Sequence, residues 1–179
     1  MASLAVSVTN AEETNEETDC LLSNCGNLQI QFKKTTKASD LIIKDDEGNA
    51  CQAAYVFTSP LKRTLLTAFA IVKSMQPIAQ IIVLPGLTEV ATARGMSKDE
   101  VIAFCNQNGI SDIDTTKMPD GEWFNANESE EEARSRITAA LVIVSAVAGG
   151  IIVSHKNTIG MALGRKTYPF KKKGETNAP

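Results

Sequence analysis

The stretch AAYVFTSPLKRTLLTA, residues 53–68, decides the fold class, because it joins a strand pattern directly to a helix pattern. Its apolar start, Ala53–Phe57, predicts a buried strand. Ser59 is a residue type that caps helices, and Pro60 suits a first helical turn, where no backbone N–H is needed. Apolar residues then repeat at helical spacing as far as Val72. We therefore predict a strand that turns sharply into a helix.

Strand and helix patterns alternate along the rest of the chain. Apolar runs predict strands at residues 4–8, 81–84 and 151–154. A serine followed three residues later by glutamate is typical of a helix start, and it occurs at Ser97 and at Ser129. Strands that alternate with helices predict a parallel or mixed sheet with helices on both faces. The ligand site of such a sheet lies beyond the carboxyl ends of its strands.

The composition is typical of one globular domain. The chain has 179 residues, of which 43% are hydrophobic, and this is sufficient for a single core. The net charge of −3 disfavours nucleic acid as a partner, and no apolar run reaches the roughly 18 residues of a membrane helix. The N-terminus lacks the basic start of a secretory signal, so we expect a cytoplasmic protein. We expect one domain over residues 1–170 and a basic flexible tail over residues 171–179.

The cysteines and the single histidine argue against a metal centre. Cys20, Cys25, Cys51 and Cys105 include no Cys-x-x-Cys pair, and a zinc site would need nearly all of them from scattered segments. We expect reduced thiols that are mostly packed in the core, and we expect no cofactor. His155 is the only histidine in the chain, which excludes any mechanism that needs two.

Three polar side chains follow predicted strands at the edge where a ligand is expected. Arg63 lies one turn into the first predicted helix, Glu89 follows residues 81–84, and His155 directly follows residues 151–154. Each alone is also compatible with an ordinary role as a surface arginine, a loop carboxylate or a histidine at a strand end. Together they suit a phosphate ester, because the guanidinium matches phosphate oxygens and the other two groups can move protons.

Four motifs occur in order along the chain. The first is Asp19 followed by Leu22, Gly26 and Gln29. The others are TSPLKRTLLTA at residues 58–68, LTE at 87–89 and VSH at 153–155. This set resembles the motifs of the histidine phosphatase superfamily, the phosphoglycerate-mutase-like proteins. The resemblance covers residues 4 to about 170 and implies a three-layer α/β/α sandwich with a mostly parallel sheet. It also implies that Arg63 binds phosphate and that Glu89 and His155 occupy catalytic positions.

The chain departs from this family at the end of the first strand. The family has Arg-His-Gly there, and its histidine takes the phosphoryl group covalently, whereas this chain has Thr9, Asn10 and Ala11. An asparagine amide is not a nucleophile, because its nitrogen lone pair is delocalised. Loss of a covalent nucleophile can lower turnover by about a million-fold. Lys156 stands where the family usually has glycine, and it either restores a positive charge to the pocket or points to solvent.

Three functions are compatible with these residues. The first is a pseudophosphatase that retains a phosphate pocket from Arg63, Asn10, Thr9 and Lys156 and acts by binding a phosphorylated small molecule or a phosphoprotein. The second is an active phosphomonoesterase or phosphomutase with a reorganised mechanism. In it His155 would serve as the nucleophile or activate water, and Glu89 would serve as the general acid. The third is an interaction protein whose pocket binds no ligand. The sequence favours the first, with no nucleic acid and no membrane among the partners.

Overall fold

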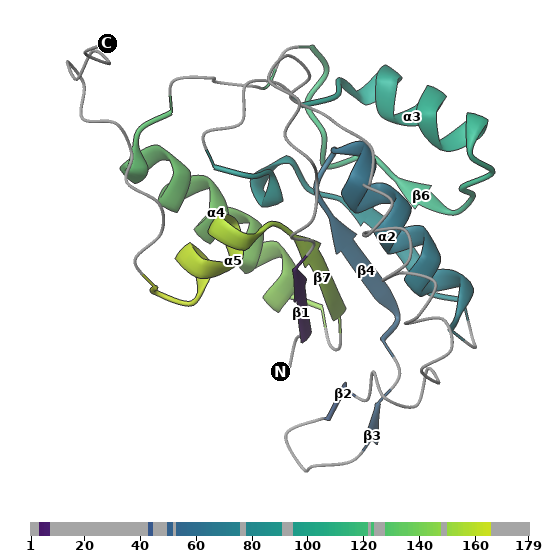
Figure 1. The fold of residues 1–179 in the computed structure, drawn as a ribbon, viewed down its shortest axis with the longest axis horizontal. Coiled ribbons are helices and arrows are strands. Elements are labelled where there is room, and N and C mark those ends of the chain that lie inside the picture. Colours follow the sequence, from purple (N-terminus) through teal and green to yellow (C-terminus); the bar gives the residue numbers. More distant parts are fainter. Residues whose placement is uncertain are drawn as a thin grey trace, which may run out of the picture.

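Five parallel strands form the central sheet of the molecule (Figure 1). The strands are β1 (Leu4–Ser7), β4 (Tyr55–Thr58), β5 (Gln80–Val83), β6 (Ile113–Asp114) and β7 (Gly150–Ser154), in the spatial order β1-β7-β4-β5-β6. Each pairing in this sheet is parallel. The carboxyl ends of β1, β4, β5 and β7 therefore lie along one edge of the sheet.

The structure is a computed structural model of the chain. It describes residues 53–75, 78–90, 95–121, 123, 128–147 and 150–165, and it describes the backbone of residues 4–7, 43–44 and 50–51.

Helices cover both faces of the sheet (Figure 1). One face carries α2 (Lys62–Lys73) and α3 (Lys98–Gln107). The other carries α4 (Glu130–Ser145), α5 (Lys156–Ala162) and the short 3-10 helix η2 (Pro85–Leu87). No helix in the described ranges is long and apolar enough to cross a membrane.

The side chains of each strand divide the core between the two faces. On one face, strand residues pack with α2 and α3 in a cluster that includes Val56, Ile81, Ile151, Leu65 and Val101. On the other face, they pack with α4 in a cluster that includes Phe57, Ile82, Ile152, Ala140 and Val144. Adjacent residues of a strand point to opposite faces, so each central strand contributes to both clusters. The three-layer α/β/α sandwich with a parallel sheet is confirmed.

The two predicted helix starts are confirmed in detail. At α3, the Glu100 N–H donates to Ser97 Oγ at 3.3 Å, and the Ser97 N–H donates to a Glu100 carboxylate oxygen at 2.8 Å. At α4, Ser129 and Glu132 make the same reciprocal pair, at 3.2 Å and 2.6 Å. These pairs satisfy backbone N–H groups that would otherwise have no partner at the helix start.

Some elements were not predicted. The strand β6 has two residues and α5 has seven, which is too short for either to show a period in the sequence. A separate antiparallel pair, β2 (Ile43–Lys44) with β3 (Ala50–Cys51), was also not predicted. The tail predicted over residues 171–179 lies outside the described residues.

Cys105 is a free thiol on the buried face of α3, in the core. Its burial raises the pKa of the thiol to about 11, because an apolar surrounding disfavours the thiolate. This agrees with the packed, reduced thiols expected from the sequence. The side chains of the other three cysteines lie outside the described residues.

The turn η2 lies directly against α4 because residue 86 has no side chain. A Cβ atom at Gly86 would lie 2.7 Å from the Cβ of Ala140 and 2.7 Å from the carbonyl oxygen of Arg136. Contacts this short force the loop or the helix to move. The same loop continues to Glu89, so this close packing also sets the position of that carboxyl group.

We expect Gly86→Ala to lower the free energy of unfolding by about 1–3 kcal/mol, the usual cost of an extra methyl group in a packed core. Urea denaturation followed by circular dichroism measures the change. Ala139→Ser, at an exposed position of the same helix, is the control and should change stability by less than about 0.5 kcal/mol. Equal stabilities for Gly86→Ala and the control would contradict the packing described for η2.

Candidate functional site

Arg63 and His155 meet at the carboxyl edge of the sheet, from elements far apart in the sequence. His155 directly follows β7, and Arg63 lies in the first turn of α2, which follows β4. An Arg63 Nη2 atom lies 3.3 Å from His155 Nδ1. Both side chains are buried, with relative exposures of 8% and 1%. The convergence of these two groups follows from the parallel register of β4 with β7.

Ser59 is the second partner of the imidazole. Its Oγ atom lies 2.8 Å from His155 Nε2 and 2.7 Å from Thr64 Oγ1. The sequence predicted Ser59 as the cap of α2, and this is wrong. The N-cap is Leu61, which makes no side-chain cap bond, and the hydroxyl of Ser59 is directed to His155 instead. Ser59 is fully buried, so its hydroxyl needs partners inside the protein.

The hydroxyl of Thr64 connects this cluster to the backbone of the turn. Its Oγ1 atom lies 2.8 Å from the carbonyl oxygen of Leu61 and 3.0 Å from that of Ser59. The strand-turn-helix segment therefore forms one side of the site with its own polar groups. Ser59 and Thr64 are site residues that sequence reasoning did not assign, because both have the ordinary pattern of a helix start.

Glu89 is held beside this cluster by the loop after η2 and by α5. Its Oε1 atom accepts from the Val90 N–H at 3.0 Å and lies 3.3 Å from Thr158 Oγ1. Burial raises the pKa of Glu89, while the backbone hydrogen bonds and the positive charge of Arg63 act in the opposite direction. The carboxyl group is thus close enough to Arg63 to interact with its charge.

The loop that carries Glu89 is tied to both neighbouring elements through its carbonyl oxygens. Ser154 Oγ donates to the Leu87 carbonyl oxygen at 2.7 Å, and Thr158 Oγ1 donates to that of Thr88 at 2.8 Å. From α4, Arg136 Nη1 donates to the carbonyl oxygens of Gly86 at 3.0 Å and Thr88 at 2.9 Å. The loop is therefore fixed through its backbone.

Arg136 is itself oriented by a carboxylate. Its Nε atom donates to a Glu128 carboxylate oxygen at 2.7 Å, and the pair forms a partly buried salt bridge. A two-pronged arginine–carboxylate pair has a fixed geometry, so Glu128 directs the remaining N–H groups to the loop. Neither residue could be assigned to the site from the sequence, because only the structure shows which loop α4 meets.

Burial and two nearby positive charges keep the imidazole of His155 neutral. Burial lowers the pKa of His155 well below its ordinary value, and the positive charges of Arg63 and Arg136 lower it further. A neutral ring can accept a hydrogen bond from Arg63, and a cationic ring with a proton on Nδ1 cannot. The contact and the pKa are therefore consistent.

The family comparison agrees with this arrangement. Residues 47–171, more than half of the chain, match the model of the histidine phosphatase superfamily (branch 1). The chain belongs to the histidine phosphatase superfamily. The comparison with curated proteins gave no match.

A solved phosphatase shares the fold. The chain is similar to the ecdysone phosphate phosphatase from Bombix mori, solved in complex with tungstate, with a TM-score of 0.57 and 20% sequence identity. The similarity covers 89% of this chain and 64% of that protein, so the chain spans less than two thirds of its length. At this identity the likeness supports the fold alone.

Three other residues, Thr9, Asn10 and Lys156, were predicted from the sequence to bind phosphate. Thr9 and Asn10 lie outside the described residues. The strand that precedes them, β1, ends at Ser7, which is paired in register with Ser154. Lys156 is exposed at the start of α5, as expected for a side chain that points to solvent, and its role in binding phosphate stays a prediction.

Metal ligands do not gather in the described part of the chain. No three histidine, cysteine, aspartate or glutamate side chains of that part lie close enough together to hold a metal ion.

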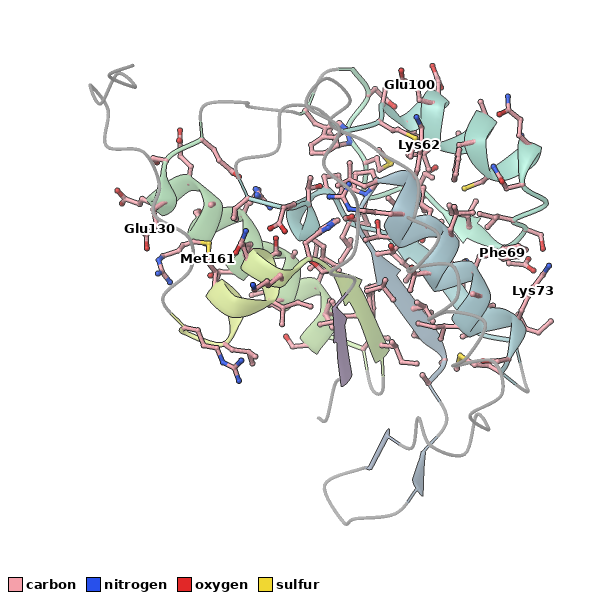
Figure 2. All side chains as sticks on the ribbon, in the orientation of Figure 1. Lys62, Phe69, Lys73, Glu100, Glu130 and Met161 are labelled. Atoms are coloured by element: carbon pink, nitrogen blue, oxygen red, sulfur yellow. The ribbon has the colours of Figure 1, made fainter. Side chains whose placement is uncertain are left out.

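The face of α4 that packs against α5 is apolar. Figure 2 shows Met161 of α5 beside α4, where it packs with Ala133 and Ile137. Glu130 lies at the N-terminal end of α4.

The raised pKa of Glu89 predicts a pH-dependent effect of Glu89→Gln. The pKa of Glu89 is higher in the folded protein than in the unfolded chain. The stability contributed by its protonated carboxyl group is fully present below the pKa of the unfolded chain, and it is lost as the pH rises through the pKa of the folded protein. Glutamine keeps the Oε1 acceptor and carries no charge. We therefore expect the variant to be more stable than wild type at pH 7, with the difference vanishing below about pH 4. Denaturant unfolding at several pH values measures it.

Asp114→Asn is the matched control of opposite sign. The hydrogen bonds from Thr116 lower the pKa of Asp114, so its charged form stabilises the fold above the unfolded pKa, and this contribution is lost as the pH falls. This variant should be less stable than wild type at pH 7. A Glu89→Gln variant that loses stability at pH 7, as Asp114→Asn does, would contradict a net cost of burying the carboxylate at position 89.

Proposed function

We propose that this chain is a catalytically impaired histidine phosphatase that binds a phosphate group and does not turn it over. The observation that supports this most directly is the buried contact between Arg63 and His155 at the carboxyl edge of the sheet. In this proposal Arg63 is the main anion-binding group, and Thr9, Asn10 and Lys156 complete the pocket. The ligand is a phosphorylated small molecule or a phosphoprotein.

The charge of Arg63 supports anion binding. Its guanidinium contacts a neutral imidazole, which leaves its positive charge uncompensated by that contact. A second positive charge, on Arg136, acts on the same site. A guanidinium binds phosphate oxygens with two parallel hydrogen bonds, so an entering oxyanion is a better partner for Arg63 than the imidazole. Tungstate, a tetrahedral oxyanion, is bound in the solved relative and is a suitable probe.

The histidine count supports the loss of turnover. The family resemblance implies two histidines, one of which takes the phosphoryl group, and the chain has one in total. Asn10 is three residues beyond Ser7, where β1 ends level with Ser154. In this proposal Asn10 occupies the nucleophile position and can only donate or accept hydrogen bonds.

One observation favours the active alternative. The raised pKa of Glu89 keeps a larger share of its carboxyl group protonated, and a protonated carboxyl can act as a general acid toward a leaving group. An active phosphomonoesterase or phosphomutase would then use His155 as its nucleophile or to activate water. The two functions differ in one measurable quantity, the turnover of phosphate monoesters.

Binding is tested with wild type and Arg63→Gln by isothermal titration of phosphate and of tungstate. Charge-assisted hydrogen bonds contribute about 1.5–3 kcal/mol, so Arg63→Gln should weaken binding by about 10- to 100-fold. Arg134→Gln is the control, because Arg134 is an exposed arginine of α4 paired with Glu130, and its affinity should equal that of wild type. No binding by wild type, or equal binding by Arg63→Gln, would contradict the proposal.

Turnover is tested with p-nitrophenyl phosphate under the same conditions. We expect the rate with wild type to equal the rate with His155→Ala, because no nucleophile remains. A wild-type rate that His155→Ala abolishes would favour the active alternative, and a phosphohistidine on His155 would establish its covalent form.

A gain of function is the constructive test. Thr9→Arg combined with Asn10→His should produce measurable hydrolysis of p-nitrophenyl phosphate, because the double variant restores the family's arginine and nucleophile to a pocket that kept its other parts. Adding His155→Ala to this variant should lower the rate again. A folded double variant without activity would show that residues 9 and 10 are misassigned or that the pocket does not admit phosphate.

A further inference from the structure

The hydrogen bonds around His155 have a defined direction, and Arg63 sets it. A guanidinium has donors and no acceptor, so Arg63 Nη2 donates to His155 Nδ1 across their 3.3 Å contact. Nδ1 must then carry a lone pair and no proton. A neutral imidazole with an unprotonated Nδ1 has its proton on Nε2. The ring is therefore the Nε2–H tautomer.

The other side of the ring follows from this assignment. His155 Nε2–H donates to Ser59 Oγ at 2.8 Å, so the proton of the Ser59 hydroxyl is free for Thr64 Oγ1 at 2.7 Å. The proton of Thr64 then goes to the carbonyl oxygen of Leu61 at 2.8 Å. Each hydroxyl accepts one bond and donates one, and the chain ends on an acceptor that has no proton to give. This order excludes Ser59 as a donor to the imidazole.

We propose that Ser59 is a positioning residue that holds Nε2 of His155 in the protein interior and so makes Nδ1 the imidazole atom that meets an anion bound by Arg63. Thr64 supports it by taking the proton of the Ser59 hydroxyl. This inference rests on the proposed function for the anion and on the described contacts for the imidazole. Ser59, Thr64 and His155 are all buried, with exposures of 0%, 0% and 1%.

Binding of an anion then requires a proton at Nδ1. When an oxyanion binds the guanidinium of Arg63, the Nδ1 lone pair loses the hydrogen bond from Arg63 Nη2. It then faces the oxygens of the anion, which repel it. A proton on Nδ1 turns this repulsion into a charge-assisted hydrogen bond, and Ser59 remains the acceptor for Nε2–H. The bound anion also offsets the positive charges that lower the pKa of the free imidazole. Anion binding is therefore accompanied by the uptake of one proton.

The charged groups that act on His155 come from three elements of the described structure. Arg63 of α2 and Arg136 of α4 both disfavour the imidazolium, and Glu89, in the loop after η2, interacts with Arg63. Lys156, on the element that His155 begins, is exposed. Arg136 is also paired with Glu128, whereas Arg63 contacts the imidazole directly, so Arg63 is the group that brings a bound anion next to the ring.

The first test needs no ligand. Because His155 is the only histidine in the chain, protein labelled with ¹⁵N-histidine gives one pair of ring signals in nuclear magnetic resonance spectra. We expect the neutral Nε2–H tautomer in the free wild-type protein between about pH 5 and pH 8, the range in which an ordinary histidine titrates. The Nδ1–H tautomer, or an ordinary titration in this range, would overturn the proposal.

Variants test the roles of Ser59 and Thr64 in the same spectra. Arg63 still donates to Nδ1 in both variants, Ser59→Ala and Thr64→Val, so both should keep the Nε2–H tautomer. Ser59→Ala removes the acceptor of Nε2–H, and Thr64→Val removes the acceptor of the Ser59 hydroxyl, so the Nε2–H signal should shift in both and exchange faster with water in Ser59→Ala. Thr64→Ser keeps the hydroxyl and should retain the wild-type signals. Thr67→Val is the control, because the Thr67 hydroxyl is also buried in α2 and donates to the Arg63 carbonyl oxygen at 2.8 Å. Wild-type spectra for Ser59→Ala and Thr64→Val would overturn the proposal.

The second test measures proton uptake with sulfate, which itself does not titrate in this pH range. The affinity of wild type should rise as the pH falls, by up to about tenfold per pH unit for one linked proton. Ser59→Ala should bind more weakly and lose this dependence in the same pH range, because an Nε2–H without an acceptor costs more to bury on a cationic imidazole than on a neutral one. Sulfate affinity that is independent of pH in wild type would overturn the proposal.

The two proposals fail in different ways. If wild type binds neither sulfate nor phosphate, the proposed function fails, and the ligand-free spectra still decide the role of Ser59. If sulfate binds through Arg63 and the spectra of Ser59→Ala equal those of wild type, the proposed function stands and the role of Ser59 is overturned.

Discussion

The hydrogen bonds of one buried imidazole hold together the edge of the sheet where the candidate site lies. His155 comes from β7, and its two ring nitrogens are bound by Arg63 and Ser59, which both follow β4. Because the ring is neutral and buried, it needs one donor and one acceptor, and the strand-turn-helix segment supplies both. The parallel pairing of β4 with β7 brings the three groups to the same level.

The second half of the site depends on the helix layer on the opposite face. The loop that carries Glu89 is held through its carbonyl oxygens, which are bound by Ser154, Thr158 and Arg136. Arg136 is fixed in turn by Glu128. Both helix layers therefore contribute to one polar cluster, α2 through Arg63 and α4 through the backbone that precedes Glu89.

Much of the fold and part of the site could be predicted from the sequence. Apolar runs and capping boxes determine local structure, and a parallel sheet brings strand ends together, so the proximity of Arg63 and His155 was accessible. The role of Ser59 was not, because its local pattern indicates a cap and its actual partner is 96 residues away. Arg136 was missed for the same reason, since its partners lie 48 and 50 residues away on another element.

The contact between η2 and α4, where Gly86 has no side chain, limits which substitutions the two elements can accept. Two atoms would meet a methyl group there, the Cβ of Ala140 and the backbone oxygen of Arg136. Exchanging the small residues, alanine at 86 and glycine at 140, relieves the first clash and leaves the second, because every amino acid has a carbonyl oxygen. The spacing between this loop and α4 is therefore set by main chain against main chain, and a larger residue at position 86 requires the loop or the helix to move.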